Sequence, residues 1–400
     1  MKCVKLNQLC EINIGKTPSR SNSKYWGKGH KWLSIADMKS KYISETKEEI
    51  TDLAVSEANM KIVPKNTVLM SFKLSIGKIG ITTEEMYTNE AIASFPIIEK
   101  EKIIPEYLYY VLKTLRYDNL SDRAVMGATL NKKKLNQIVI PLPSIIVQKK
   151  IVNLLNKAEE LIDKRKAQIE ALDQLTQSVF LEMFGDPITN PKGWKLAICK
   201  DITSKIGSGA TPKGGNASYK QQGISLIRSM NVYNNNFNYN DLAFIDEEQA
   251  EKLKNVIVNK DDILLNITGA SVARSCIVPD DVLPARVNQH VSIIRVIKHL
   301  INPIFLSYTF TNEIYQKYLL RLSTSGGATR EAITKKQIEN LPIIIPPLDL
   351  QEQFAIKVTK IKEQKSIIQK SIGEIENLFN SLMQKAFKGE LFNEEKVPNL

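Results

Sequence analysis

Two stretches of the chain carry apolar residues at alternating steps of three and four, which is the spacing of a helix with one continuous apolar face. The first stretch runs from Ile151 to Met183 and the second from Phe354 to Ala386. A period of about 3.5 residues sustained over about five heptads predicts coiled-coil helices. A helix of about 36 residues is about 54 Å long, longer than a compact domain of this size is wide. We therefore expect both helices to project and to bury their apolar faces against each other as an antiparallel pair.

Prolines precede both helical segments, and Gly185 and Gly389 follow them. Proline interrupts a strand but is tolerated at a helix start, whereas glycine is the usual residue just beyond a helix end. Short β-type runs and shorter helical patterns fill the rest of the chain: strands are expected at 68–70 and 263–265, and helices at 105–115 and 303–320. The pattern predicts an α+β fold in which two related globular α/β domains are joined by two long antiparallel coiled-coil helices.

The two globular domains are predicted to be copies of each other, because matching segments recur in the same order. Thr17-Pro18 pairs with Thr211-Pro212, and 89–90 pairs with 288–289. The other matched segments are 12–38 with 205–232, 63–78 with 258–274, 105–112 with 303–310, 127–129 with 327–329, and 138–151 with 343–356 without a gap. Such an ordered series indicates a tandem duplication. We expect a first domain at 1–143, a helix at 144–184, a second domain at 185–346, a helix at 347–392 and a tail at 393–400.

The stretch Gly15-Lys16-Thr17 resembles the end of a phosphate-binding loop, which would suggest a nucleotide hydrolase. Such a loop needs a second glycine five residues upstream, so that backbone N–H groups can surround the phosphates. Cys10 stands at that position instead, and Pro18 follows at once. We therefore assign the stretch to the repeat and not to a nucleotide site.

Composition narrows the class of partner and the compartment. The chain has 400 residues, of which 43% are hydrophobic, with a net charge of +12 and a pI near 9.2, which favours a polyanionic partner. The cysteines are far apart and form no CxxC pair: Cys3, Cys10, Cys199 and Cys276. Their spacing favours a reducing cytosol over a disulfide framework or a zinc module. The N-terminus has no apolar signal-peptide core and no stretch is long enough to span a membrane, so we expect a cytoplasmic protein without membrane contact.

Each helical segment is introduced and closed by similar motifs. The first is introduced by IPLP (140–143) with Gln148, and the second by IPPL (345–348) with Glu352-Gln353. The closing motifs are MFGDP (183–187) and AFKGEL (386–391). In this arrangement the chain resembles, over essentially all its length, the specificity subunit of type I restriction–modification systems. One departure is that no acid precedes Gln148, so the start of the first helix is expected to be less firmly held.

The resemblance implies a function and partners. It implies one target recognition domain in each half, each reading one part of a split, asymmetric sequence in double-stranded DNA. The helices would act as a spacer and help to seat methyltransferase (modification) subunits and, through them, the restriction (helicase/nuclease) subunit. No cofactor is expected on this chain. S-adenosylmethionine, ATP and Mg are expected on the partner subunits.

The chain is poor in catalytic residues, which leaves an enzyme as the weaker alternative. Its histidines are His30, His290 and His299, with no HExxH motif, and no GxGxxG opens a strand–helix unit. Asp280 or Asp281 with the distant 363–365 triplet could be drawn as a nuclease site, but the triplet lies on the predicted coiled-coil helix. A stand-alone nuclease or methyltransferase fragment, and a coiled-coil scaffold without DNA binding, remain the alternatives.

Residues suited to DNA contact recur at matched places in the two halves. Lysine, arginine and hydroxyl groups bind phosphates, whereas arginine, asparagine and glutamine read base edges. The candidates in the first half are Arg20, Ser21, Lys24, Lys73, Lys78, Asn89, Lys132 and Lys133. The candidates in the second half are Lys213, Asn216, Lys220, Arg274, Asn288, Gln289, Arg330, Lys335 and Lys336. For any single lysine, the alternative is an ordinary solvated surface charge.

Two further segments have alternative interpretations. The Gly-Ala-Thr stretches at 127–129 and 327–329 are expected as loops, which would either hold a phosphate or make a tight turn capped by threonine. The asparagine-rich stretch 232–241 has no clear counterpart in the first half. Its asparagines could read adenine, or the stretch could be a flexible polar loop.

Overall fold

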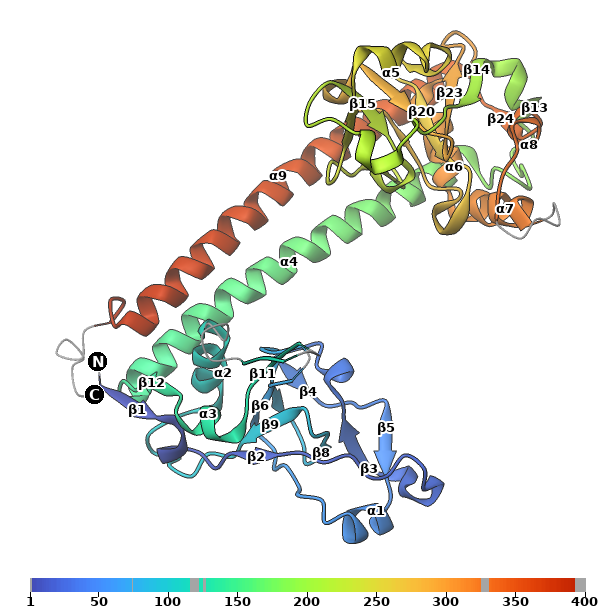
Figure 1. Cartoon of the computed structure of the whole chain (residues 1–400). Helices are drawn as coiled ribbons and strands as arrows, with labels where there is room; N and C mark the ends of the chain where they lie inside the picture. Colours follow the sequence, from blue (N-terminus) through green and yellow to red (C-terminus); the bar gives the residue numbers. More distant parts are fainter. Residues whose placement is uncertain (1, 74, 116–121, 125–126, 325–330, 393–400) are drawn as a thin grey trace. The chain divides into compact units, whose positions relative to one another are not determined.

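The computed structural model describes residues 2–73, 75–115, 122–124, 127–324 and 331–392 (Figure 1). The chain forms two compact units, one of residues 1–166 with 370–400 and one of residues 167–369. Each unit contains one globular domain and a segment of both long helices, α4 (Ile145–Phe184) and α9 (Leu348–Lys388). The predicted α+β fold with two long helices is confirmed.

The first globular domain is built on a five-stranded sheet in the order β2-β9-β6-β7-β4. Its strands are β2 (Asn13–Ile14), β4 (Tyr42–Ile43), β6 (Val68–Ser71), β7 (Ile79–Thr82) and β9 (Ile92–Phe95). All neighbours are antiparallel except β4, which is parallel to β7. The predicted strand at 68–70 is the fully buried β6 at the centre of this sheet.

Smaller elements complete the first domain. A three-stranded sheet has the order β5-β3-β8, with β3 (Trp26–Leu33), β5 (Glu48–Ile50) and β8 (Tyr87–Thr88). Two strand pairs join β1 (Cys3–Lys5) to β12 (Val139–Pro141) and β10 (Asp122–Ala124) to β11 (Gly127–Thr129). The helices are α1 (Asp52–Glu57), α2 (Pro105–Thr114) and α3 (Lys132–Asn136). The expected Gly-Ala-Thr loop at 127–129 is therefore wrong, because its backbone pairs as a strand.

The second domain repeats this plan. Its main sheet has the order β14-β23-β20-β21, with β14 (Thr203–Ser208), β20 (Ile263–Asn266), β21 (Ser275–Ile277) and β23 (Val291–Val296). The other sheet has the order β18-β15-β22-β19, with β15 (Ile224–Ile227), β18 (Ala243–Ile245), β19 (Ile257–Val258) and β22 (Ala285–Val287). β3 is parallel to β8, and β15 is likewise parallel to β22. This shared topology, including the matched parallel pairs β3–β8 and β15–β22, supports the tandem duplication.

The remaining elements of the second domain are helices and two antiparallel strand pairs. The pairs are β13 (Lys195–Ile198) with β24 (Pro342–Ile345) and β16 (Val232–Tyr233) with β17 (Asn236–Phe237). The helices are α5 (Glu247–Glu251), α6 (Pro303–Thr311), α7 (Glu313–Thr324) and α8 (Lys335–Glu339). The single helix expected at 303–320 is thus two helices. Asn312 separates them, because its side chain accepts from the Ile314 N–H at 3.0 Å and caps α7.

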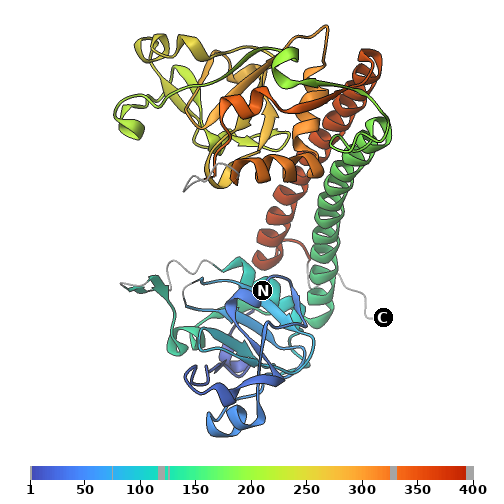
Figure 2. The same cartoon turned by 90° about the vertical axis from the view of Figure 1, so that its right-hand side faces the viewer.

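The two long helices run antiparallel within each unit (Figure 1, Figure 2). In the second unit, Phe354 near the start of α9 packs on Phe180 near the end of α4, with ring centroids 5.5 Å apart. An ion pair of 2.5 Å joins Lys365 to Asp173 in the same unit. In the first unit, Lys166 of α4 and Glu376 of α9 are 3.6 Å apart.

The register assigned to the two helix starts from sequence is wrong by two residues. The gap-free match of 138–151 with 343–356 pairs Gln148 with Gln353, but Gln351 is the buried counterpart of Gln148. Gln148 donates to the carbonyl of Pro143 at 2.9 Å, and Gln351 donates to that of Pro346 at 2.8 Å. Neither residue directly follows an acid, so the expected weakness at the first helix start has no basis in the comparison of the two halves.

Candidate nucleic-acid interface

Four segments, which belong to three loops of each domain, lie at the same end of its main sheet. Because neighbouring strands are antiparallel, the carboxyl ends of β2 and β6 lie beside the amino ends of β9 and β7. A fifth segment joins them where the Leu130 N–H donates to the Phe72 carbonyl at 3.0 Å. We call this group of segments the first sheet-end site: 15–17, 72–73, 78, 89–91 and 130–133.

The second domain forms an equivalent group at the same end of its sheet. The Ile333 N–H donates to the Ile267 carbonyl at 2.8 Å, as Leu130 does to Phe72. The Asn266 N–H donates to the Arg274 carbonyl at 2.8 Å, as Ser71 does to Lys78 at 2.9 Å. The second sheet-end site comprises 209–211, 267–268, 274, 288–290 and 333–336.

A glycine allows the first loop of each site to lie directly on its neighbour. A Cβ on Gly15 would be 2.2 Å from the Asn89 carbonyl oxygen, and a Cβ on Gly209 would be 1.8 Å from that of Val287. Both glycine N–H groups donate into the neighbouring loop, Gly15 to Ile92 and Gly209 to Asn288, at 3.1 Å each. Any larger residue would push the loops apart.

Matched asparagines shape the neighbouring turn. The Asn89 side chain accepts from the Ala91 N–H at 3.1 Å, and the Asn288 side chain accepts from the His290 N–H at 3.0 Å. Such bonds to a backbone N–H two residues on are the usual way asparagine stabilises a turn. Both asparagine side chains therefore stabilise their own turn. The residue that follows each of them is exposed.

A threonine orients that exposed residue in both sites. Thr17 donates its hydroxyl to the carboxylate of Glu90, and Thr211 donates to the side-chain oxygen of Gln289. In the second site the chain of bonds continues. The Gln289 amide nitrogen lies 3.1 Å from His290 Nε2, and His290 Nδ1 lies 2.5 Å from the Thr268 hydroxyl. Since an amide nitrogen only donates, this arrangement places the imidazole proton on Nδ1.

Five of the eight predicted first-half residues fall within the first sheet-end site: Lys73, Lys78, Asn89, Lys132 and Lys133. Arg20 lies elsewhere, stacked 3.7 Å above the Trp26 ring with its two terminal nitrogens on Glu48. These bonds raise the pKa of Arg20 and lower that of Glu48. Arg20 was predicted as a DNA contact; in the structure it lies outside the site and is paired with Glu48.

The predicted second-half residues divide in the same way. The site contains Arg274, Asn288, Gln289, Lys335 and Lys336. Lys213 and Asn216 lie in the loop and 3-10 turn that precede β15, and Lys220 is paired with Asp246 at 3.2 Å. Arg330 and the stretch 327–329 lie outside the described residues. In the first half, Ser21 and Lys24 occupy the corresponding loop, where the Ser21 and Ser19 hydroxyls are 2.8 Å apart.

The asparagine-rich stretch 232–241 forms the β16–β17 hairpin. Asn235 adopts a left-handed φ of 53° at its turn and donates to the Thr311 hydroxyl at 2.7 Å. Asn234 accepts from Gln316 at 2.9 Å. These asparagines contact α6 and α7, so the interpretation as a flexible polar loop does not hold for them.

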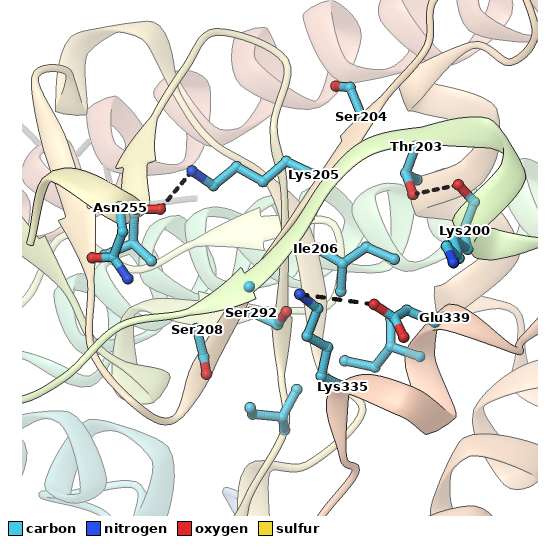
Figure 3. Close-up of a pocket in the computed structure, with 14 residues that line it drawn as sticks. Lys200, Thr203, Ser204, Lys205, Ile206, Ser208, Asn255, Ser292, Lys335 and Glu339 are labelled. Carbon is cyan, nitrogen blue, oxygen red and sulfur yellow. Dashed lines mark hydrogen bonds and ion pairs between the residues drawn. The ribbon is translucent and has the colours of Figure 1, made fainter.

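A cavity of about 660 Å³ lies beside the second sheet-end site, along the edge strand β14 (Figure 3). Lys335 points across it toward Glu339, 3.8 Å away, and Lys205 donates to the Asn255 carbonyl at 2.5 Å. Burial lowers the pKa of Lys205, and the charge of Arg295 acts in the same direction. The lining is basic, but both of these ammonium groups already have partners.

Sequence reasoning did not recognise Thr17, Glu90, Thr211, Thr268 and His290 as members of the two sites. The sequence carried one signal for them: the pair 89–90 matches 288–289 in the repeat, and Thr17 likewise matches Thr211.

Within the described residues, no three His, Cys, Asp or Glu side chains are grouped as metal ligands are, and none of the helices there has the length and apolar character of a membrane span. All four cysteines are free.

The doubled domain and its paired sheet-end sites define a protein made of two copies of one module. The family model of the type I restriction modification DNA specificity domain matches residues 1–172 and again residues 191–377. The chain therefore belongs to the type I restriction–modification DNA specificity family.

Relatives and solved structures agree with this assignment. The MjaIX specificity subunit of Methanocaldococcus jannaschii is 28% identical over 98% of this chain and 93% of that protein. The EcoBI specificity subunit of Escherichia coli is 24% identical over 76% of this chain and 69% of that protein. The fold is similar to that of an S subunit from M. genitalium, with a TM-score of 0.54 at 14% identity over 96% of both chains. A chain from a structure of type I R-M complex assembly gives a TM-score of 0.63 at 16% identity over 98% of both chains.

Proposed function

We propose that this chain is the DNA specificity subunit of a type I restriction–modification complex, and that each domain reads one half of a bipartite, asymmetric duplex target through its sheet-end site. The observation that carries the proposal is that the two sites share one backbone geometry but carry different side chains, of which Glu90, Lys78 and Gln289 are exposed. Glu90, Lys78 and Ala91 of the first site correspond to Gln289, Arg274 and His290 of the second. Two domains that read different sequences need this combination of a common frame and different contacts.

The charge distribution supports binding to a polyanion. The first site contains Lys73, Lys78, Lys132 and Lys133, and the chain as a whole carries a net charge of +12. Lysines that neutralise phosphates release counterions, so affinity for DNA would fall steeply as salt rises. Side chains without charge, such as Asn89, Asn288 and Gln289, would not add to this dependence.

Partner subunits would dock on the long helices. Large apolar side chains remain exposed on both: Leu161, Leu175 and Leu181 on α4, and Ile356, Ile367 and Leu378 on α9. These side chains offer apolar contacts that another protein would bury on binding. We assign these surfaces to methyltransferase subunits, and through them to the restriction subunit. S-adenosylmethionine, Mg and ATP would be bound by those partners, and the complex would act in the cytoplasm.

An exchange of domains tests the proposal. Residues 1–143 are replaced by the same region of a relative with a different target, and the target is determined from the DNA that the assembled complex methylates. The expected result is a new sequence in one half-site and no change in the other. A change in both half-sites, or in neither, would contradict the assignment of one half-site to each domain.

Two controls separate the alternatives. The purified chain alone, incubated with DNA, Mg and S-adenosylmethionine, is expected to give no cleavage or methylation, whereas a nuclease or methyltransferase fragment would give product. In a gel-shift assay at two salt concentrations, the chain is expected to bind DNA more weakly at high salt. A coiled-coil scaffold would show no such salt-dependent binding.

A further inference from the structure

Glu90 and Gln289 occupy the same place in the two halves of the molecule. Each follows the asparagine that shapes its turn, each is exposed, and each accepts a hydrogen bond from the threonine at the matched position of the first loop. The two side chains have the same length and shape. They differ only in that one carries a carboxylate and the other an amide.

This difference decides which base edge each side chain can bind in the major groove. A carboxylate only accepts, and its usual partner is the amino group of cytosine. An amide both donates and accepts, and it can bond adenine at N6 and N7 together. A hydrogen bond from threonine holds the carboxylate or the amide in place but leaves some of its hydrogen-bonding groups free.

The hydrogen-bonding groups that Glu90 and Gln289 still have free match cytosine and adenine, respectively. Thr17 bonds one carboxylate oxygen of Glu90, Oε2, which leaves Oε1 for an amino group outside the protein. Thr211 bonds the oxygen of Gln289 and the Gln289 nitrogen donates to His290. The amide still has one N–H and one lone pair, which is the pair of groups that adenine requires.

We propose that Glu90 and Gln289 determine specificity at corresponding positions of the two half-sites, Glu90 by selecting cytosine and Gln289 by selecting adenine. This inference rests on the proposed function. A purely structural role for Glu90 predicts a different outcome, because the second domain shows that glutamine can accept the same threonine bond. The substitution Glu90→Gln therefore keeps the support of the loop and changes only the base-reading chemistry.

The test is a selection of bound duplexes from a random pool by the full-length chain, followed by sequencing, for the wild type, Glu90→Gln and Gln289→Glu. The wild type is expected to enrich a bipartite motif. Glu90→Gln is expected to shift the preference at one position of one half-site from cytosine to adenine by about tenfold, and to leave all other positions unchanged. Gln289→Glu is expected to make the opposite change in the other half-site.

Further variants separate orientation from base reading. Thr17→Val and Thr211→Val remove the orienting hydroxyl but keep the base-reading group. They are expected to weaken the preference at the same positions without exchanging the base. Thermal unfolding of each variant shows whether it is folded.

The outcomes distinguish the inference from the function on which it rests. If folded Glu90→Gln and Gln289→Glu return the wild-type motif, or lose a half-site without gaining a new base, the inference is overturned and the proposed function stands. If the wild type itself enriches no bipartite motif, the proposed function fails.

Discussion

Gln148 and Gln351 hold equivalent positions at the starts of the two long helices. The Gln148 oxygen accepts from the Ile104 N–H at 3.1 Å, and the Gln351 oxygen accepts from the Asn302 N–H at 2.8 Å. Ile104 and Asn302 stand directly before the first residues of α2 and α6. A buried amide thus connects each long helix to the start of a domain helix, and it does so through the same bond in both halves.

Replacing either glutamine by alanine is expected to destabilise its unit. The change leaves buried backbone groups without a partner, and we expect a loss of about 1–3 kcal/mol for Gln148→Ala or Gln351→Ala. Denaturant unfolding followed by circular dichroism measures the effect. The exposed Gln174 of α4 provides the control, since Gln174→Ala removes no buried bond. Equal stability of Gln148→Ala and Gln174→Ala would show that the connection contributes nothing.

Because two loops approach closely in the second sheet-end site, alanine substitutions at two nearby glycines are expected to differ strongly in their effect on stability. In Gly209→Ala the new Cβ would be 1.8 Å from a carbonyl oxygen, whereas at Gly207 no atom lies within 4 Å of that position. We expect Gly209→Ala to cost about 1–3 kcal/mol and to weaken DNA binding, because the loops must separate. Gly207→Ala should leave both properties nearly unchanged. Similar behaviour of the two variants would argue against the close loop contact.

A buried polar cluster in the first unit predicts a pH dependence of stability. Burial alone would raise the pKa of Glu159, but hydrogen bonds from Tyr110 and Lys113, with the charges of Lys113 and Lys41, outweigh it and lower the pKa below 4.5. A carboxylate with a lowered pKa stabilises the fold above its unfolded pKa, and this contribution is lost as the pH falls through the folded value. The first unit should therefore lose stability as the pH is lowered below about 4.5.

Glu159→Gln tests this dependence. The variant is expected to be less stable at neutral pH by about 1–3 kcal/mol and to show a weaker loss of stability between neutral and acidic pH. Unfolding midpoints measured over a pH series give both quantities. Glu160→Gln is the matched control on the same helix, because Glu160 is an exposed partner of Lys164 and its charge is screened. An unchanged acid dependence in Glu159→Gln would contradict the role assigned to the cluster.

The lysines of α3 are expected to bind phosphates. Removing both with Lys132→Ala and Lys133→Ala should reduce the slope of log affinity against log salt by about one per lysine that contacts a phosphate. Lys100 follows the opposite end of β9 and serves as the control, since Lys100→Ala should leave the slope unchanged. If Lys100→Ala changed the slope and the substitutions at Lys132 and Lys133 did not, the DNA would lie at the other end of the sheet.

The sequence predicted those features that depend on local pattern or on repetition. The heptad spacing indicated α4 and α9, and the ordered matches set Lys132 and Lys133 against Arg330, Lys335 and Lys336, and Asn89 against Asn288. Repetition also identified 89–90 and 288–289 as equivalent. It could not show what these residues contact, because Thr17 and Glu90 are 73 positions apart in the chain.

The features that sequence analysis missed depend on contacts between distant segments. Arg20 was predicted as a DNA contact, and nothing near it in the sequence indicates that Glu48 would pair with it or that its guanidinium would stack on Trp26. Gln148 was matched to Gln353 because the motifs align without a gap, and only the buried bonds of Gln351 show the true register. The stretch 127–129 was expected as a loop because glycine favours turns, but pairing with β10 makes it a strand.

Site-specific photocrosslinking tests the central claim most directly. A photoreactive residue is placed at position 73 of the first sheet-end site, at position 268 of the second, or at position 100 as a control, and each full-length chain is irradiated with a duplex that carries the selected target. Position 73 is expected to crosslink to bases of one half-site, position 268 to bases of the other, and position 100 to neither. Crosslinks from position 100 alone, or from positions 73 and 268 to the same half-site, would contradict it.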